Sequence, residues 1–117
     1  MVVGIIVSSD LMFISKVKEV AAAAQGQVKV ARSMQALEQA LAEAGEPGVL
    51  MIDLEKSAVP RESLTEPVAG LISRGWKVVS FFSHVHEELA GEAERLGLGE
   101  VMPRSKFVRV LPGLFER

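Results

Sequence analysis

Four groups of polar and charged side chains stand where apolar runs of this sequence end. They are Ser8, Ser9 and Asp10; Asp53; Ser83 and His84; and Arg104, Ser105 and Lys106. Among them, a carboxylate, a hydroxyl and an ammonium group form a set that can receive and hold a phosphoryl group. Asp53 would be the nucleophile. Ser83 and Lys106 would bind the added oxygens through a hydrogen bond and a positive charge.

These groups can act together only if the fold brings the ends of the runs to one place. Apolar runs rich in β-branched residues predict strands, which we expect over residues 2–7, 28–31, 49–54, 76–82 and 100–103. The run that leads to Asp53 is continuously apolar, which is typical of a strand buried on both faces. Pro103 cannot donate a hydrogen bond to a neighbouring strand, so the last strand is expected at an edge of the sheet.

Helical periodicity fills the segments between the predicted strands. Expected N-terminal caps are Ser9 or Asp10, Ser33, Thr65 and Ser83, and expected stops are Gly26, Gly45, Gly75 and Gly97. A last short helix is expected over residues 107–115, with a break at Pro112 left open. The alternation predicts an α/β fold, a doubly wound five-stranded parallel sheet of order 2-1-3-4-5 with helices on both faces. We expect a single domain over residues 1–117, without an effector domain.

On these residues the chain resembles, from end to end, the receiver domain of two-component response regulators. Asp53 stands at the position of the phospho-acceptor, Ser83 at that of the hydroxyl after strand four, and Lys106 at that of the lysine after strand five. The spacings of 30 residues from Asp53 to Ser83 and 23 from Ser83 to Lys106 are close to those of receivers. The resemblance implies a flavodoxin-like fold and a signalling role in a phosphorelay.

The resemblance is incomplete where receivers bind Mg²⁺. Receivers carry an acidic pair after the first strand, and here Ser8 and Ser9 stand in its place. Mg²⁺ requires hard oxygen ligands, mostly anionic, and two serines supply no charge. Asp10 lies one residue later, where we expect it to face outward as a helix cap. We therefore expect no cofactor, with weak Mg²⁺ binding through Asp53, at most, left open.

Three further positions depart from the receiver pattern. Phe107 follows Lys106 where receivers have proline, Pro103 stands at the usual position of an aromatic switch residue, and His84 replaces a small residue after Ser83. A bulky side chain at position 84 would crowd the crevice. Together these departures indicate a degenerate receiver, or pseudo-receiver.

Each candidate residue also has a simpler interpretation. Asp53 could form a permanent ion pair with Lys106 or cap a turn, without ever being phosphorylated. Ser83 could be a helix cap, with a role as a phosphoryl contact only if Asp53 is modified. Residues 8–10 could form a capping turn or a weak cation site, and the capping turn is favoured.

The two histidines give little support to a metal site or to catalysis. His84 and His86 are two residues apart, whereas a metal-binding pair on a helix is four apart, so we expect both to face solvent, with pH sensing as the alternative. A hydrolase built from Ser83, His84 and Asp53 is disfavoured. Adjacent Ser and His side chains rarely point at each other, and the sequence has no G-x-S-x-G elbow.

Composition excludes several classes of function. The formal net charge of -2 argues against nucleic acid as a partner, and the absence of cysteine removes disulfides and thiolate sites. No apolar run approaches the ~20 residues of a membrane span, and neither a P-loop nor a G-x-G-x-x-G motif occurs. We expect a cytoplasmic protein that binds neither membranes nor nucleic acid.

The last predicted helix is unusually rich in large apolar side chains, namely Phe107, Val110, Leu111, Leu114 and Phe115. Either all of them belong to the core, or some form a surface for a partner. Such a surface would include the fourth and fifth helices and the fifth strand, and a homodimer is one form that it could take.

The sequence thus predicts a stand-alone, receiver-like signalling module of two-component or phosphorelay type. We expect it to act through contacts with a kinase, a regulator or a second copy, with impaired Mg²⁺-dependent phosphorylation and no enzymatic activity. The first alternative is a phosphorylation-competent single-domain response regulator with Asp53 as acceptor. The distant alternative is a small flavodoxin-like enzyme or ligand-binding domain.

Overall fold

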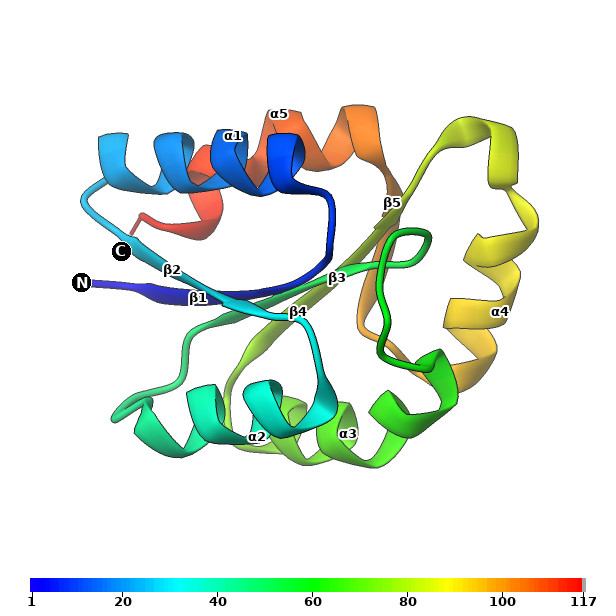
Figure 1. The fold of residues 1–117 in the computed structure, drawn as a ribbon, viewed down its shortest axis with the longest axis horizontal. Coiled ribbons are helices and arrows are strands. Elements are labelled where there is room, and N and C mark those ends of the chain that lie inside the picture. Colours follow the sequence, from blue (N-terminus) through cyan, green and yellow to red (C-terminus); the bar gives the residue numbers. More distant parts are fainter. Residues whose placement is uncertain (117) are drawn as a thin grey trace.

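A five-stranded parallel sheet forms the centre of the protein (Figure 1). The computed structural model describes residues 1–116, and the side chain of His84 lies outside the described part. The strands are β1 (Val3–Val7), β2 (Gln27–Ala31), β3 (Val49–Asp53), β4 (Lys77–Phe82) and β5 (Glu100–Pro103). Their order is β2-β1-β3-β4-β5. The predicted fold class and strand order are confirmed, and each strand lies within one residue of its predicted bounds.

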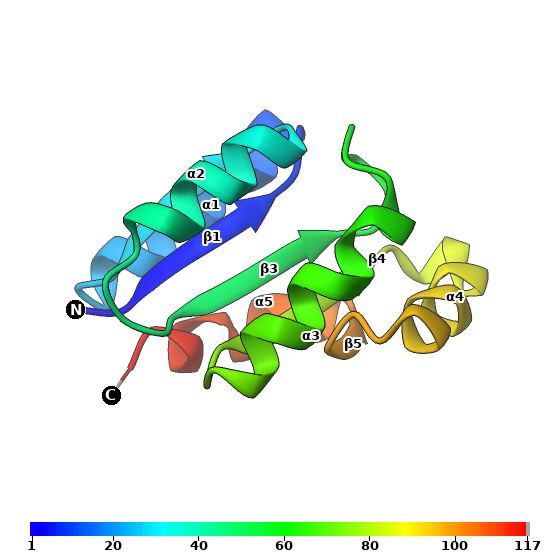
Figure 2. The same ribbon diagram turned by 90° about the horizontal axis from the view of Figure 1, so that it is seen from below.

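A helix follows each strand, and the helices cover both faces of the sheet. They are α1 (Leu11–Ala23), α2 (Met34–Glu43), α3 (Thr65–Ser73), α4 (Glu88–Leu96) and α5 (Arg104–Leu114), with short 3₁₀ helices η1 (Arg61–Leu64) and η2 (His84–His86) before α3 and α4. Helices α1 and α5 lie together on one face, and α2 and α3 lie on the other, with α4 farther out (Figures 1 and 2). No helix in the described residues is both long and apolar enough to cross a bilayer.

Each face of the sheet has its own apolar core because successive strand residues point to opposite faces. Ile5 belongs to the core under α2, α3 and α4, and Ile6 to the core under α1 and α5. In the second core, the rings of Phe81 and Phe107 stack with centroids 4.4 Å apart, and Phe13 packs against both. The aromatic contacts fix α1 and α5 to the centre of the sheet.

Strand register brings the first site residues together. Val7 pairs with Ile52, and Asp53 pairs with Phe81 on the other side of β3. The chain therefore leaves β1 at Ser8, directly beside the carboxyl end of β3. This edge of the sheet is where open α/β folds place their ligands and their chemistry.

Two of the predicted helix caps are wrong. Thr65 is the first residue of α3 rather than its cap, because η1 leads straight into the helix, and the Thr65 hydroxyl is buried without a hydrogen-bond partner among the described residues. Ser83 precedes η2 and makes no side-chain cap, and α4 begins only at Glu88. The predicted caps Asp10 and Ser33 are confirmed.

Glycines end two helices as predicted, but α1 ends differently. Gly75 and Gly97 have φ angles of 93° and 71°, in the left-handed region that glycine adopts most easily. After α1 the left-handed residue is Gln25, with φ 63°. Gly26 instead leaves room for Phe115, because a Cβ at this position would lie 2.5 Å from the Phe115 ring.

Helix α5 begins at Arg104, earlier than predicted, and Pro112 lies within its last turn. Of the five large apolar side chains in this segment, three are buried and two are partly buried: Phe107, Leu111 and Phe115, then Val110 and Leu114. All five pack on the core under α1 and α5. The core interpretation therefore accounts for most of this apolar surface.

Candidate functional site

Asp53 is the last residue of β3 and is buried, with 1% of its surface exposed. Its Oδ2 accepts a hydrogen bond from the Ser8 hydroxyl at 2.8 Å. Its Oδ1 accepts from the backbone N–H groups of Glu55 and Lys56, each at 3.0 Å. Both carboxylate oxygens therefore already have hydrogen-bond donors.

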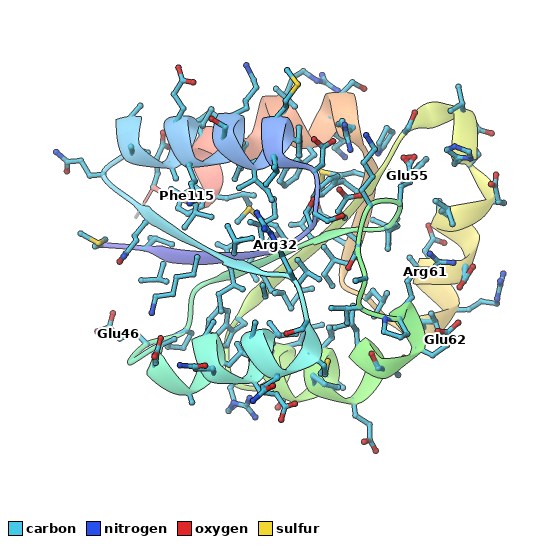
Figure 3. All side chains as sticks on the ribbon, in the orientation of Figure 1. Arg32, Glu46, Glu55, Arg61, Glu62 and Phe115 are labelled. Carbon is cyan, nitrogen blue, oxygen red and sulfur yellow. The ribbon has the colours of Figure 1, made fainter. Side chains whose placement is uncertain are left out.

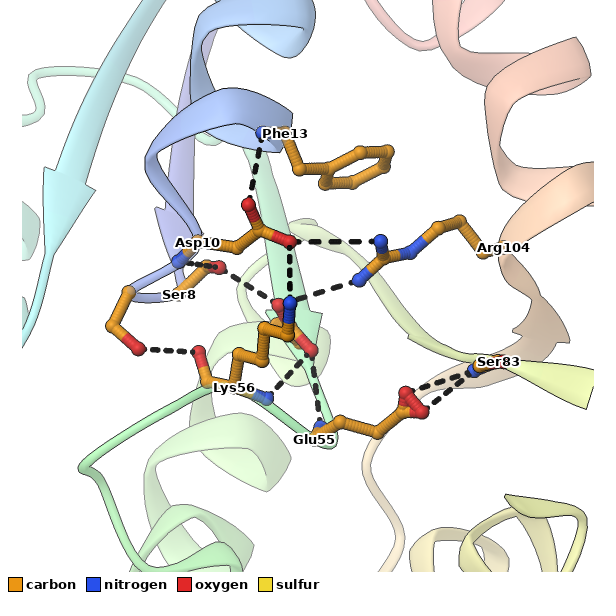
Figure 4. Close-up of polar contacts among 9 residues, drawn as sticks. Ser8, Asp10, Phe13, Glu55, Lys56, Ser83 and Arg104 are labelled. Atoms are coloured by element: carbon orange, nitrogen blue, oxygen red, sulfur yellow. Dashed lines mark hydrogen bonds and ion pairs between the residues drawn. The ribbon is translucent and has the colours of Figure 1, made fainter. Parts of the chain in front are cut away.

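The cation beside Asp53 is Arg104, the first residue of α5. Its Nη2 lies 3.8 Å from Asp53 Oδ2, and its Nη1 lies 3.6 Å from Asp10 Oδ2 (Figure 4). The guanidinium carbon also lies 4.3 Å from the centroid of the Phe13 ring, a cation–π distance. Arg104 thus joins the ends of β1 and β3 to the start of α5.

The prediction that Lys106 pairs with Asp53 is wrong. Lys106 is exposed and takes part in none of the ion pairs of the described chain. Successive residues of an α-helix are rotated by about 100° about its axis. Lys106 lies two residues after Arg104, so it points roughly to the opposite side of the helix. Arg104 faces the crevice, and Lys106 therefore faces outward. The sequence prediction began the helix at residue 107, so it could not infer from helical rotation which of residues 104–106 faces inward.

Asp10 caps α1, as predicted, but it faces the crevice rather than solvent. Its Oδ1 accepts from the N–H of Phe13 at 3.2 Å, and its Oδ2 pairs with Lys56 at 3.5 Å and with Arg104. The Phe13 hydrogen bond contributes most to lowering the pKa of Asp10. Lys56 and Arg104 lower it further, and partial burial opposes them. Asp10 is therefore a shared counter-ion for two cations.

Ser8 and Ser9 hold the loops of the crevice in place. The Ser8 hydroxyl donates to Asp53 and accepts from the N–H of Asp10 at 3.1 Å. The N–H and hydroxyl of Ser9 donate to the Lys56 carbonyl at 2.7 and 3.1 Å. These contacts agree with the capping-turn interpretation, and the bond from Ser8 to Asp53 adds a link that the sequence prediction lacked.

Ser83 joins the site through its backbone. Its N–H donates to both carboxylate oxygens of Glu55, at 3.1 and 3.2 Å (Figure 4). Sequence reasoning missed Glu55 and Lys56, since the only signal for them is that they lie two and three residues after Asp53. The His84 prediction concerns a side chain outside the described part of the structure. His86 is exposed, as predicted, and its Nδ1 lies 3.4 Å from Glu88.

The donor set does not fit Mg²⁺. The described residues contain no group of three or more His, Cys, Asp or Glu side chains placed to hold a metal ion. The two carboxylates of the crevice, Asp10 and Asp53, both contact Arg104, whose positive charge occupies the space between them. A divalent cation prefers several anionic or carbonyl oxygens and repels a guanidinium group. The crevice is built as an internal ion network.

Comparison with protein-family models, curated proteins and solved structures found no match to this chain. What the structure itself shows is a flavodoxin-like topology, with helices alternating with a sheet of order 2-1-3-4-5. Chemically, the crevice offers a carboxylate whose oxygens are engaged and whose charge is balanced by an arginine.

Proposed function

We propose that this chain is a receiver-like signalling module that acts through protein–protein contacts, without Mg²⁺-dependent phosphorylation of Asp53. The observation that carries the proposal is the enclosure of Asp53. The carboxylate is buried and accepts from Ser8, Glu55 and Lys56, with Arg104 beside it. A phosphoryl donor would have to compete with these contacts for an oxygen of a buried carboxylate.

Charge balance supports the same proposal. Phosphoryl transfer needs cations that neutralise the charge developing on the transferred group, a role that Mg²⁺ fills in many enzymes. In this crevice Arg104 is already paired with Asp10 and Asp53, and the second cation, Lys56, is paired with Asp10. At least one of these ion pairs would have to break before a cation could neutralise a phosphoryl group on Asp53.

The receiver-like geometry supports a signalling role rather than catalysis. Asp53 ends β3, Ser83 follows β4, and Lys106 lies in the first turn of α5, the arrangement on which the resemblance to receivers rests. Two hollows near the crevice are open, and Asp53 lines neither of them. We therefore propose a protein partner, either a kinase or a regulator, in preference to a small substrate.

A homodimer through α4, β5 and α5 is the second form of contact included in the proposal. Phe107, Leu111 and Phe115 are buried and take no part in such a contact. Partly buried Val108 and Val110 remain available on α5. Light scattering over a range of concentrations tests this form of contact, and a monomer at every concentration would reject it.

Incubation with acetyl phosphate and Mg²⁺, followed by intact mass spectrometry, tests the central claim. We expect the mass of the wild-type chain to stay unchanged while a phosphorylatable receiver in the same tube gains one phosphoryl group. In the Arg104→Ala variant, which uncovers Oδ2 of Asp53, we expect at most slow modification.

One result would replace the proposal with its main rival. If the wild-type chain gains a phosphoryl group and the Asp53→Asn variant does not, the chain is a phosphorylation-competent single-domain response regulator. Ser83 and Lys106 would then be the first residues to test as phosphoryl contacts. Titration with Mg²⁺ by NMR gives an independent check, since we expect no selective shift of the amides of residues 53–56.

A further inference from the structure

Helix α4 is held to the rest of the molecule by little apolar surface. Ala93 is its one buried residue, whereas α1 buries Phe13, Ile14, Val17 and Ala21. Leu89, Ala90 and Leu96 of α4 are only partly buried. Because apolar stabilisation scales with the area removed from water, α4 depends more than the other helices on polar contacts.

The first polar contact is made by Glu55. Its carboxylate accepts the N–H of Ser83 with both oxygens, at 3.1 and 3.2 Å. Ser83 stands directly before η2, the turn that leads into α4. A charged acceptor strengthens such a bond relative to a neutral one, so Glu55 fixes the start of the segment that carries α4.

The second polar contact is made by Arg61. Its Nε and Nη2 donate to the two carboxylate oxygens of Glu92 on α4, at 3.0 and 3.2 Å. Its Nη1 donates to the Leu54 carbonyl at 2.9 Å. The bidentate geometry is the strong form of an arginine–carboxylate pair. One guanidinium therefore joins the middle of α4 to the residue that follows Asp53.

Both contacts start from the loop that Asp53 shapes. The Oδ1 atom of Asp53 accepts the N–H groups of Glu55 and Lys56, and Leu54 is the next residue along the chain. Figure 3 shows Glu55 and Arg61 on the side of this loop that lies toward α4. We call residues 54–61 the coupling loop.

The coupling loop and α4 meet at the surface of the molecule. An open hollow lies there, lined by Leu54, Glu55, Arg61, His86, Glu88 and Leu89. Tight cores resist displacement because every shift creates a void or a clash. A hollow bridged by charged side chains allows two elements to move relative to each other while the bridges re-form or break.

We propose that the coupling loop transmits the state of the Asp53 crevice to α4 through Glu55 and Arg61. When the crevice changes, for example when a partner draws Arg104 away from Asp53, the loop moves and α4 is loosened together with η2. The surface that responds carries Val85, which is 68% exposed, and the acidic first turn of α4. This inference goes beyond the proposed function, because it needs no phosphorylation and no particular partner.

Hydrogen–deuterium exchange of the full chain, followed by mass spectrometry, tests the two contacts. In Glu55→Ala and in Glu92→Gln we expect residues 83–96 to exchange about tenfold faster, the ratio expected when a hydrogen bond to a charged group is lost. Exchange in α1 should stay unchanged. Glu94→Gln is the matched control, because this substitution removes the same charge from the same helix. Glu94 is exposed and appears in none of the ion pairs of the described chain.

Transmission from the crevice is tested by a double-mutant cycle. Arg104→Ala should accelerate exchange of residues 83–96 in the wild-type background, and by a clearly smaller factor in the Glu55→Ala background. An equal factor in both backgrounds would overturn the proposal, and so would unchanged exchange of α4 in Glu55→Ala and Glu92→Gln. If Glu55→Ala does not fold, Glu55→Met keeps the length of the side chain without an acceptor oxygen for the Ser83 N–H and serves in its place.

These experiments use the unmodified chain without Mg²⁺ or a phosphoryl donor. Their outcome is therefore separate from that of the phosphorylation assay. Both proposals would be rejected if Asp53 is phosphorylated and if hydrogen exchange in α4 does not respond to the substitutions at Glu55, Glu92 and Arg104. An unmodified Asp53 with coupled exchange would support both of them.

Discussion

The two sides of the Asp53 crevice are built from different interactions. On one side, α1 and α5 are fixed by the rings of Phe13, Phe81 and Phe107. The centroids of these rings lie 4.4–5.9 Å apart. On the other side, α4 buries Ala93 alone and is tied by the carboxylates of Glu55 and Glu92. Local stability follows apolar burial, so the first side is a fixed frame and the second is the part that can respond.

Truncation of one apolar side chain on each side tests this contrast most strongly. Phe107→Ala removes a fully buried ring and should lower the free energy of unfolding by about 4 kcal/mol. Leu89→Ala, on the partly buried face of α4, should cost about 1 kcal/mol. Urea denaturation monitored by circular dichroism measures both, and equal losses would contradict the contrast.

Arg104→Ala should cost less than loss of the aromatic ring. The substitution removes an ion pair with Asp10, another with Asp53 and the contact with the Phe13 ring. Arg104 is 30% exposed in its side chain, so solvent weakens these interactions, and we expect a loss of about 2 kcal/mol. Arg109→Ala is the control on the same helix, because Arg109 is exposed and outside every ion pair of the described chain. It should be close to neutral.

Ser8→Ala should have a smaller effect that is confined to the crevice. The buried hydroxyl donates to Asp53 and accepts from the N–H of Asp10, and its removal leaves both groups with one partner fewer. We expect a loss of about 1 kcal/mol in unfolding free energy. Ser8→Thr, which keeps the hydroxyl, should lose less of that stability than Ser8→Ala if hydrogen bonding is the cause. Equal losses in the two variants would point to packing instead.

The weakest expected effect is a dependence of stability on pH that comes from Asp10. Its pKa is lowered in the folded protein, first by the Phe13 N–H and then by Lys56 and Arg104. The ionised carboxylate therefore stabilises the fold above its ordinary pKa, about pH 4, and this contribution is lost as the pH falls through the folded-state value. Asn keeps the cap but not the charge.

The comparison of wild type with Asp10→Asn by urea denaturation isolates that charge. We expect a difference below about 1 kcal/mol near neutral pH that disappears in acid. A difference that persists unchanged at low pH would mean that the charge of Asp10 is not the cause.

Sequence reasoning located the strands because buried apolar runs leave a clear pattern, as between Val49 and Asp53. It placed Asp53 at the crevice, and Asp10 at the start of α1, from local rules alone. It chose Lys106 over Arg104 because of the resemblance to receivers, and it began the last helix at residue 107, whereas α5 begins at Arg104 and this arginine faces the crevice. Helix phase at a terminus is set by the tertiary contacts of the first turn, and single-sequence patterns do not contain them.

Glu55 shows a second limit of sequence reasoning. Its partner is a backbone N–H at Ser83, 28 residues away, and every non-proline residue has such a group. No pattern of residue types distinguishes this N–H from its neighbours. The same holds for Arg61, one of whose acceptors is the Leu54 carbonyl. Contacts between loops through the backbone become visible only when the fold is known.

The packing of Phe115 has a practical consequence for work with this protein. The ring closes over Gly4 and Gly26, where a Cβ atom would lie 2.7 and 2.5 Å from it, and it thereby anchors the last described turn beside β1. The N-terminal end and the last described turn lie together, on the side of the sheet away from α4 (Figure 1). A fluorophore or an immobilisation tag attached near Met1 or after the last described turn would leave the crevice and α4 accessible to a binding partner in solution.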